Sequence, residues 1–482
     1  MGILSKLEPK CVFEYFEELC AVPHGSGNVK QISDLCAGFA ERLGLPYRQD
    51  EAGNLIIWKA GTPGYEEAPT VILQGHMDMV CAKSGDCSKD MTRDGLDLAS
   101  DGEWVWAEKT SLGGDNGIAV AMILGLLADE SLPHPPLEAV FTVDEETGMG
   151  GAFALDCSDL KGRRMLNLDS EEEGVFTVSC AGGARLDCFI PALQAPLEGE
   201  KGCVVTVSGL RGGHSGMDID KGGASANQLL GRSLYAASER IKGFRTAELR
   251  GGQFDNVICG RSQGFVAVPA DQVSNFEAFI READHVLKAE YAGCDRDVAL
   301  TCEPAALETA LSLEDTHRLL RTLAILPQGV QAMSADFPGL VQTSLNLGIL
   351  RTETDGLHAT VSVRSSFASQ KDMLCRQVQA ILETGGGRAE IRSSYPGWQY
   401  RRQSAVREQL LTIYQEISGR AGRLAATHGG LECGIFAEKI PGLNVVSLGP
   451  DIRDVHSPRE RLSVKSTQRV YRLVREFLKR SR

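Results

Sequence analysis

Hydrophobic residues near the amino terminus recur at helical spacing. Val12, Phe16 and Leu19 lie three or four positions apart, which predicts two amphipathic helices within residues 11–43. Further along, the apolar runs become short and uninterrupted, as is typical of strands buried on both faces of a sheet. These runs cover residues 70–73, 137–143 and 165–168, with a helix expected at 117–128. This alternation predicts an α/β fold with a mixed, largely parallel sheet flanked by helices.

The pattern changes between about residues 187 and 399. Strands of alternating character at 204–208 and 359–365 are interleaved with helical stretches near 224–241, 273–290 and 370–384. This mixture predicts a separate α+β domain. A helix at 404–418, a buried strand at 444–448 and an amphipathic helix at about 464–480 then complete the first sheet. We therefore expect one domain from residues 1–186 and 400–482 and an inserted domain from residues 187–399.

Acidic residues and histidines follow the predicted buried strands. The first run is followed by His76 and Asp78, the second by Asp144, Glu145 and Glu146, the third by Asp169 and the last by His456, while Asp115 precedes a helix. Ligands bind beyond the carboxyl ends of strands in open α/β sheets, so these side chains are expected to converge. Two histidines with three or four carboxylates match a paired divalent-metal site, most naturally zinc.

Composition excludes several other classes of protein. The 482 residues carry 50 Lys and Arg against 64 Asp and Glu, a net charge of -14, which repels phosphate backbones and anionic lipid surfaces. We therefore expect no nucleic-acid partner. The 14 cysteines are scattered singly, which predicts reduced thiols in a cytoplasmic protein. Apolar runs fall short of the roughly 20 residues that span a bilayer, so no membrane partner is expected either.

Six segments resemble one known family in their sequence and their order. They are GHMDMV at 75–80, SLGGDNGIA at 111–119, FTVDEETGMGG at 141–151, NLDSEEEG at 167–174, GGHSG at 212–216 and HGGLECGIF at 428–436. Together they resemble the M20 metallopeptidases, and within that family the aminoacyl-histidine dipeptidases. The resemblance extends over nearly the whole chain. It implies that residues 1–186 and 400–482 form a catalytic, metal-binding domain and that residues 187–399 form a lid or dimerisation domain.

The resemblance also implies a ligand set. Asp115 would bridge two Zn²⁺ ions per subunit, with Co²⁺ or Mn²⁺ as other possible ions. His76 and Asp169 would complete the coordination of one ion. Glu146 and His456 would complete that of the other. The expected site therefore draws its ligands from five separate segments of the chain.

Five further residues are expected to support the chemistry. Asp78 lies two residues past the first histidine ligand, so it can accept the second ring N–H and fix the imidazole tautomer. Glu145 would take a proton from water and return it to the leaving amine. The resemblance implies that His214 stabilises the oxyanion, that Arg364 binds the substrate carboxylate and that Asn256 binds the substrate backbone. Because the equivalent of His214 often comes from another domain or subunit in relatives, lid closure or a homodimer is implied.

Several alternatives stay open. Asp115 taken alone is an ordinary helix N-cap, Glu432 and Asn116 either support the site or simply pack, and His428 either lines the substrate pocket or is an ordinary histidine. The predicted function is a dinuclear zinc dipeptidase that hydrolyses unblocked dipeptides, with Xaa-His as the preferred class. The alternatives are an N-acyl amino acid amidohydrolase of the same fold and a non-catalytic scaffold. A scaffold would have a broken ligand set, whereas every expected ligand is present in this sequence.

Overall fold

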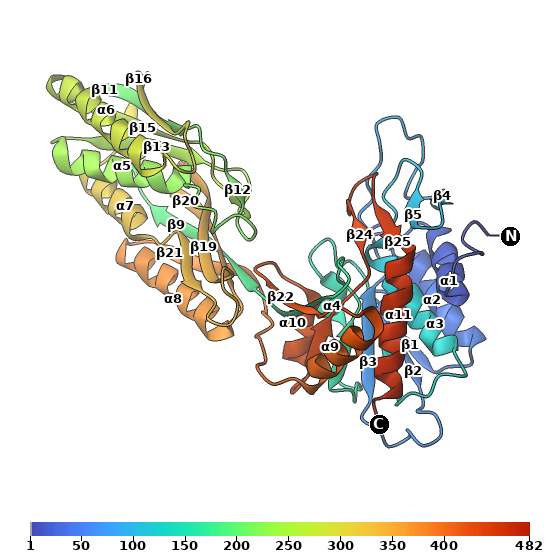
Figure 1. Cartoon of the computed structure of the whole chain (residues 1–482). Helices are drawn as coiled ribbons and strands as arrows, with labels where there is room; N and C mark the ends of the chain where they lie inside the picture. Colours follow the sequence, from blue (N-terminus) through green and yellow to red (C-terminus); the bar gives the residue numbers. More distant parts are fainter. Residues whose placement is uncertain (1) are drawn as a thin grey trace. The chain divides into compact units, whose positions relative to one another are not determined.

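The chain divides into two compact units in the computed structural model, which describes residues 2–482 (Figure 1). Unit 1 contains the residues up to Ser179, Trp398–Ala426 and Leu431–Arg482. Unit 2 contains Cys180–Gly397 and Thr427–Gly430. The sequence predicted the domain boundaries near residues 186 and 399, and the lid or dimerisation role of the inserted segment stays a prediction.

An eight-stranded sheet forms the centre of unit 1. Its strands are, in spatial order, β1 (Tyr47–Gln49), β2 (Leu55–Lys59), β6 (Leu137–Thr142), β3 (Val71–His76), β7 (Arg164–Asn167), β23 (Asn444–Ser447), β8 (Val175–Cys180) and β22 (Arg423–Thr427). The four central strands β6, β3, β7 and β23 are parallel, whereas β1, β2 and β8 pair antiparallel. Both β3 and β6 are buried at every position. This confirms the predicted mixed, largely parallel sheet.

Helices flank this sheet. They are α1 (Lys10–Cys20), α2 (Lys30–Arg42), α3 (Gly114–Ala128), α4 (Gly150–Ala154), α9 (Ala405–Ser418), α10 (Glu432–Lys439) and α11 (Val464–Lys479). Helix α3 is buried from Gly114 to Leu127 because it packs against both α1 and β3. A second, four-stranded sheet has the order β24 (Ile452–Arg453), β25 (Arg461–Ser463), β5 (Trp104–Ala107) and β4 (Leu98–Ser100). The turn between β24 and β25 carries His456.

Unit 2 is an α+β structure, as predicted. Its nine-stranded sheet has the order β16 (Ala299–Pro304), β11 (Lys201–Ser208), β15 (Ser262–Val268), β13 (Arg245–Gly251), β19 (Val341–Glu353), β20 (Gly356–Ser365), β9 (Gly182–Pro191) and β21 (Arg388–Tyr395), and β18 (Gly329–Met333) pairs with β19. Helices α5 (Ala226–Arg240), α6 (Val273–Glu290), α7 (Leu313–Ile325) and α8 (Ala368–Thr384) lie along it (Figure 1). The remaining elements are β10 (Gln194–Pro196), β12 (Gly213–His214), β14 (Val257–Ile258), η1 (Ala270–Gln272) and β17 (Thr309–Leu311).

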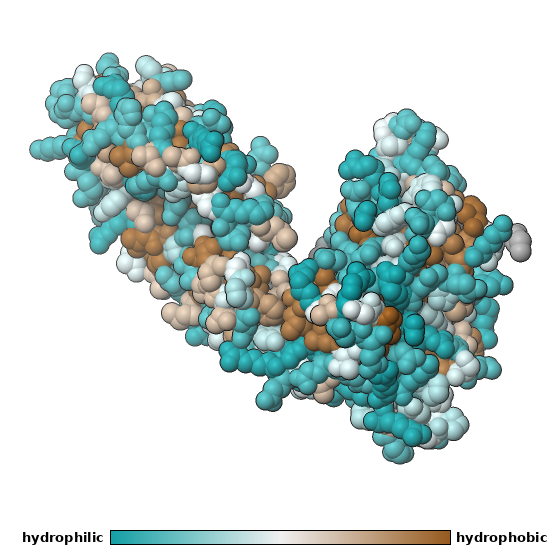
Figure 2. Space-filling model, in the orientation of Figure 1, coloured by the Kyte–Doolittle hydropathy of each residue, from teal (hydrophilic) through white to brown (hydrophobic). Residues whose placement is uncertain are grey.

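The visible surface is mostly hydrophilic, with hydrophobic residues in small patches (Figure 2). Within residues 2–482, none of the helices combines the length and the apolar character that crossing a bilayer requires. The cysteines of this part of the chain form no disulfide bond, as the sequence predicted.

Candidate active site

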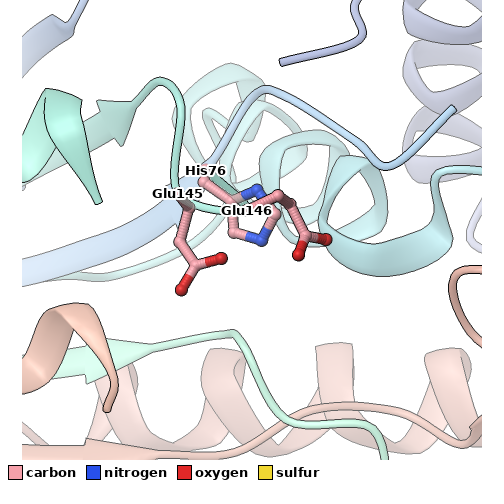
Figure 3. A group of neighbouring side chains, drawn as sticks. All are labelled: His76, Glu145 and Glu146. Atoms are coloured by element: carbon pink, nitrogen blue, oxygen red, sulfur yellow. The ribbon is translucent and has the colours of Figure 1, made fainter. Parts of the chain in front are cut away.

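The parallel strands of unit 1 bring the predicted ligands to one edge of the sheet. His76 is the last residue of β3, Glu145 and Glu146 follow β6, and Asp169 follows β7. Because the carboxyl ends of parallel strands share one edge, residues far apart in sequence become neighbours there. Figure 3 shows the side chains of His76, Glu145 and Glu146 next to one another. Asp115 enters from the first turn of α3, where its backbone departs from helical geometry.

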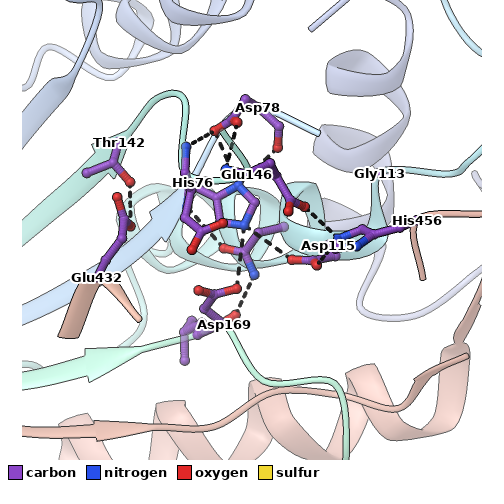
Figure 4. Close-up of polar contacts among 12 residues, drawn as sticks. His76, Asp78, Gly113, Asp115, Thr142, Glu146, Asp169, Glu432 and His456 are labelled. Carbon is purple, nitrogen blue, oxygen red and sulfur yellow. Dashed lines mark hydrogen bonds and ion pairs between the residues drawn. The ribbon is translucent and has the colours of Figure 1, made fainter. Parts of the chain in front are cut away.

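Asp115 lies between the two histidines and presents one oxygen to each (Figure 4). Its Oδ1 is 3.2 Å from Nε2 of His76, and its Oδ2 is 3.2 Å from Nε2 of His456. The His76 nitrogen is also 3.5 Å from Asp169 Oδ1, and the His456 nitrogen is 2.7 Å from Glu146 Oε1. Each side of Asp115 therefore holds one histidine and one further carboxylate.

The charge of this cluster favours bound cations. Burial and the carboxylates of Asp169, Glu432 and Glu146 raise the pKa of Glu145 to about 9. Asp115 and Glu146 raise the pKa of His456 to about 10. Buried carboxylates in such number need positive charge nearby, because burial penalises their ionised form. The donor set, imidazole nitrogens with carboxylate oxygens, suits two divalent ions, and each trio His76–Asp115–Asp169 and Asp115–Glu146–His456 is compact enough to share one.

Asp78 holds the first histidine and the loop after β6. The ring Nδ1 of His76 is 3.0 Å from the Asp78 carbonyl oxygen and 3.4 Å from its Oδ1, so Nδ1–H points at Asp78 and Nε2 faces Asp115 and Asp169. The Asp78 carboxylate also accepts hydrogen bonds from Ser26 Oγ at 2.7 Å, from Glu145 N at 3.1 Å and from Glu146 N at 3.4 Å. Asp78 is fully buried and lies beside the imidazole, and its role in fixing the tautomer stays a prediction.

Asn116 and Glu432, left open from the sequence, are both buried and hydrogen-bonded, and Figure 4 shows Glu432 beside Thr142. Asn116 accepts from the backbone N–H of His76 at 3.1 Å and donates to the Leu168 carbonyl at 2.8 Å, which ties the ends of β3 and β7 together. Glu432 accepts from Gln74 at 2.7 Å and from Thr142 at 2.8 Å. Both residues therefore support the strands that carry the ligands.

His214 lies in unit 2 with its tautomer set by the backbone. Its ring Nδ1 accepts hydrogen bonds from the N–H groups of Gly216 and Met217, both at 3.2 Å. The ring proton must then be on Nε2, which leaves His214 as an N–H donor. Burial and the charge of Arg364 lower the pKa of His214, so the ring stays neutral at pH 7. A ring N–H donor is what the predicted oxyanion role requires.

The other two predicted substrate-binding residues lie close to His214 in unit 2. Strands β12 and β14 pair His214 with Val257, and Ser215 N donates to the Asn256 carbonyl at 2.9 Å. Arg364, on β20, approaches Gly216 so closely that a Cβ there would be 3.3 Å from the guanidinium carbon. The structure thus brings all three predicted residues together.

Several polar atoms of unit 2 are buried without a hydrogen-bond partner in the described chain, and one of them belongs to Arg364. Arg364 donates through Nη1 to the Tyr395 hydroxyl at 3.1 Å, but its Nε is unpaired. His428 lies 2.7 Å from Ser344 Oγ through Nε2. Burial and Arg364 lower the pKa of His428 to about 4, so this histidine is neutral. An unpaired buried donor such as Arg364 Nε favours a ligand that can accept a hydrogen bond.

Glu460 is a residue of the site that the sequence analysis missed. Its buried carboxylate accepts from the backbone N–H groups of Leu112 at 2.8 Å, Gly113 at 3.2 Å and Asp115 at 3.3 Å. It follows His456 by four positions in the segment HSPRE. An acidic residue four positions after a predicted ligand could have been singled out from the sequence. Its hydrogen-bond partners could not, because they are backbone N–H groups, which are present at nearly every residue.

A sequence profile described as Peptidase family M20/M25/M40 matches residues 72–480. The chain belongs to this family. Cytosol non-specific dipeptidase of Escherichia coli (strain K12) is 35% identical to this M20 peptidase over 484 residues, which cover 99% of either chain. The family that the sequence motifs indicated is therefore confirmed.

Solved structures of relatives have the same fold as this M20 peptidase. The aminoacylhistidine dipeptidase of Vibrio alginolyticus is 34% identical and superposes with a TM-score of 0.93, covering 99% of this chain and 98% of that one. An aminopeptidase of Bacillus cereus gives a TM-score of 0.56 at 16% identity over 98% of this chain and 99% of its own, which shows a shared fold alone.

Proposed function

We propose that this M20 peptidase is a dinuclear zinc dipeptidase that hydrolyses unblocked dipeptides, with Xaa-His among its substrates. The single observation that carries the proposal is the position of Asp115, whose two oxygens lie 3.2 Å from two different histidines. The names of two full-length relatives, a cytosol non-specific dipeptidase and an aminoacylhistidine dipeptidase, support the substrate class.

His76 and Asp169 would hold one ion, Glu146 and His456 the other, and Asp115 would bridge them. When bound, two zinc ions supply Lewis acidity and make a coordinated water acidic enough to ionise near neutral pH. Asp78 keeps the His76 proton on Nδ1, so that Nε2 is available as a ligand. Bound divalent cations would lower the pKa of Glu145 from the value of about 9 that burial and the neighbouring carboxylates give it. The ionised Glu145 carboxylate would then take the proton of the attacking water and pass it to the nitrogen of the leaving amine.

The residues of unit 2 would recognise the substrate. The Nε2–H of His214 would donate to the oxyanion, since Nδ1 is already an acceptor. The guanidinium of Arg364 would bind the substrate carboxylate, which can accept from its unpaired Nε. Asn256 would bind the substrate backbone. We propose residues 187–399 as the lid or dimerisation domain that supplies these groups, in a homodimer.

The test is hydrolysis of a substrate panel by zinc-loaded protein. The panel contains Xaa-His dipeptides, other dipeptides, the same dipeptides with an acylated amino terminus, and N-acyl amino acids. We expect cleavage of the free dipeptides, its loss after dialysis against a chelator, and its return with added zinc. Cobalt and manganese are added in parallel to the stripped protein to test the choice of metal.

The substrate panel distinguishes a dipeptidase from an N-acyl amino acid amidohydrolase and from a non-catalytic scaffold. Faster cleavage of N-acyl amino acids than of free dipeptides would favour an amidohydrolase instead. No hydrolysis of any compound at two zinc ions per chain would leave a non-catalytic scaffold as the better interpretation.

A further inference from the structure

We propose that Glu460 is a positioning residue that ties the loop of Asp115 to the turn of His456. It would thereby set the geometry of the ion site formed by Asp115, Glu146 and His456. This inference rests on the proposed function, because it takes these three residues as ligands. It concerns a residue that binds no ion itself.

The carboxylate of Glu460 is only 2% exposed and is fully used by backbone donors. Oε2 accepts from Leu112 N at 2.8 Å and from Gly113 N at 3.2 Å, while Oε1 accepts from Asp115 N at 3.3 Å. These donors belong to the first turn of α3 and the residues before it, whose N–H groups have no partner within the helix. A carboxylate at that position also interacts favourably with the helix dipole.

Glu460 is not itself placed to bind an ion. The groups of His, Cys, Asp and Glu side chains that are compact enough to share an ion, within residues 2–482, do not include it. Both of its oxygens face N–H groups rather than the histidine nitrogens. Its effect must therefore act through the segments that it joins.

The two segments that Glu460 joins are otherwise held very differently. The Asp115 loop is fixed to β3 and β7 through Asn116, which bonds to His76 N at 3.1 Å and Leu168 O at 2.8 Å. His456 lies on an exposed turn with φ of 58°, and the side chain of His456 is 44% exposed. Without Glu460, Asp115 would stay aligned with His76 but lose its fixed position relative to His456.

A second buried carboxylate, that of Asp78, joins segments of the chain on the other side of the site. Asp78 holds His76 together with the backbone of Glu145 and Glu146. The loss of Glu460 should therefore weaken one ion site and spare the other, whereas a general loss of folding would weaken both. This asymmetry distinguishes positioning from a merely structural role.

The experiment is a titration of metal-free protein with zinc alone, followed by calorimetry, for the wild type, Glu460→Gln and Asp454→Asn. Glutamine keeps the shape of the side chain but turns an NH₂ group toward N–H donors. We expect Glu460→Gln to weaken one of two zinc sites by about 10-fold to 100-fold, the usual effect of removing a residue that orients a ligand. Asp454, exposed on the same turn, is the matched control, and Asp454→Asn should bind zinc like the wild type.

Hydrogen exchange of the metal-free wild type gives a readout that does not depend on how well the variant folds. The amides of Leu112, Gly113 and Asp115 should exchange slowly, and fast exchange of all three would overturn the proposal. Equal zinc affinities at both sites in Glu460→Gln and wild type would also overturn it, while wild-type hydrolysis of dipeptides would leave the proposed function intact. A wild type that binds fewer than two ions would contradict both proposals.

Discussion

The two regions that carry the predicted functional residues have opposite imbalances of hydrogen-bond donors and acceptors. In unit 1, the carboxylates of Asp115, Glu146 and Asp169 crowd around two histidines, so acceptors outnumber donors. In unit 2, Arg364 has an unpaired buried N–H and His214 is held as a donor, so donors lack acceptors. Buried polar groups in native proteins are almost always paired. The comparison therefore indicates cations for the first region and an anionic or carbonyl-bearing ligand for the second.

The regions also differ in how they are held. The predicted ligands in unit 1 come from five segments, and the buried carboxylates of Asp78 and Glu460 join several of those segments. The loop of His214 in unit 2 is one continuous stretch, and Asp295 accepts hydrogen bonds near both of its ends. Substitutions in unit 1 should therefore change metal binding or turnover, and those in unit 2 should change substrate affinity or alignment.

The largest effect is expected from Glu145→Ala. Turnover should fall by about 10² to 10⁴-fold, the usual contribution of a general base, because no other group would take the proton of water. Both zinc ions should stay bound, since neither the trio His76–Asp115–Asp169 nor the trio Asp115–Glu146–His456 uses Glu145. Single-turnover kinetics and metal analysis of the same sample measure both quantities. Loss of an ion would instead show that Glu145 is a metal ligand. The separation in unit 1 between residues that bind metal and a residue that transfers the proton would then be wrong.

His456→Ala should remove one ion of the pair. His456 Nε2 is 3.2 Å from Asp115 and 2.7 Å from Glu146, so its loss leaves that side with carboxylates alone. We expect the zinc content after dialysis to fall from two per chain toward one. His317→Ala, exposed on α7, is the control, because His317 belongs to none of the side-chain groups of the described residues that are compact enough to share an ion. An unchanged content of two zinc ions per chain would show that His456 is not needed to bind a cation in unit 1.

The sequence was sufficient to find His76, Glu146 and Asp169, because each follows a strand whose burial is visible as an apolar run. Asp115, before a helix, and His456, on a turn, were placed by the family resemblance. The runs before His76 and Asp169 became β3 and β7, whose parallel pairing fixes where those residues lie. The role of Glu460 could not be predicted in this way, since its partners are backbone N–H groups at residues 112–115. The tautomer of His214 likewise depends on N–H groups that only the folded loop brings to Nδ1.

A smaller effect is expected from Arg364→Ala in unit 2. Loss of a charge-assisted hydrogen bond costs about 1.5 to 3 kcal/mol, so kcat/KM for a dipeptide should fall by roughly 10-fold to 100-fold, mostly through KM. The zinc content should not change. Tyr395→Phe removes the hydroxyl group to which Arg364 Nη1 donates but keeps the guanidinium, so it should have a much weaker effect on kcat/KM. A lowered kcat at unchanged KM would contradict the assignment of Arg364 to the substrate carboxylate.

The smallest effect is expected from Asp295→Asn, which tests whether the loop of His214 needs its buried clamp. Asp295 is 1% exposed and accepts from Arg211 N at 2.9 Å and from Ala224 N at 2.8 Å, on either side of His214. Asparagine can keep only one of these bonds, and a lost hydrogen bond costs about 1 kcal/mol, so kcat should fall about fivefold. Asp297→Asn, exposed on the same turn, should leave kcat unchanged. If the two variants have the same kcat, the alignment of His214 depends on its pairing with β14 instead. Asp295 would then differ from Asp78 and Glu460, the buried carboxylates that hold the segments of unit 1.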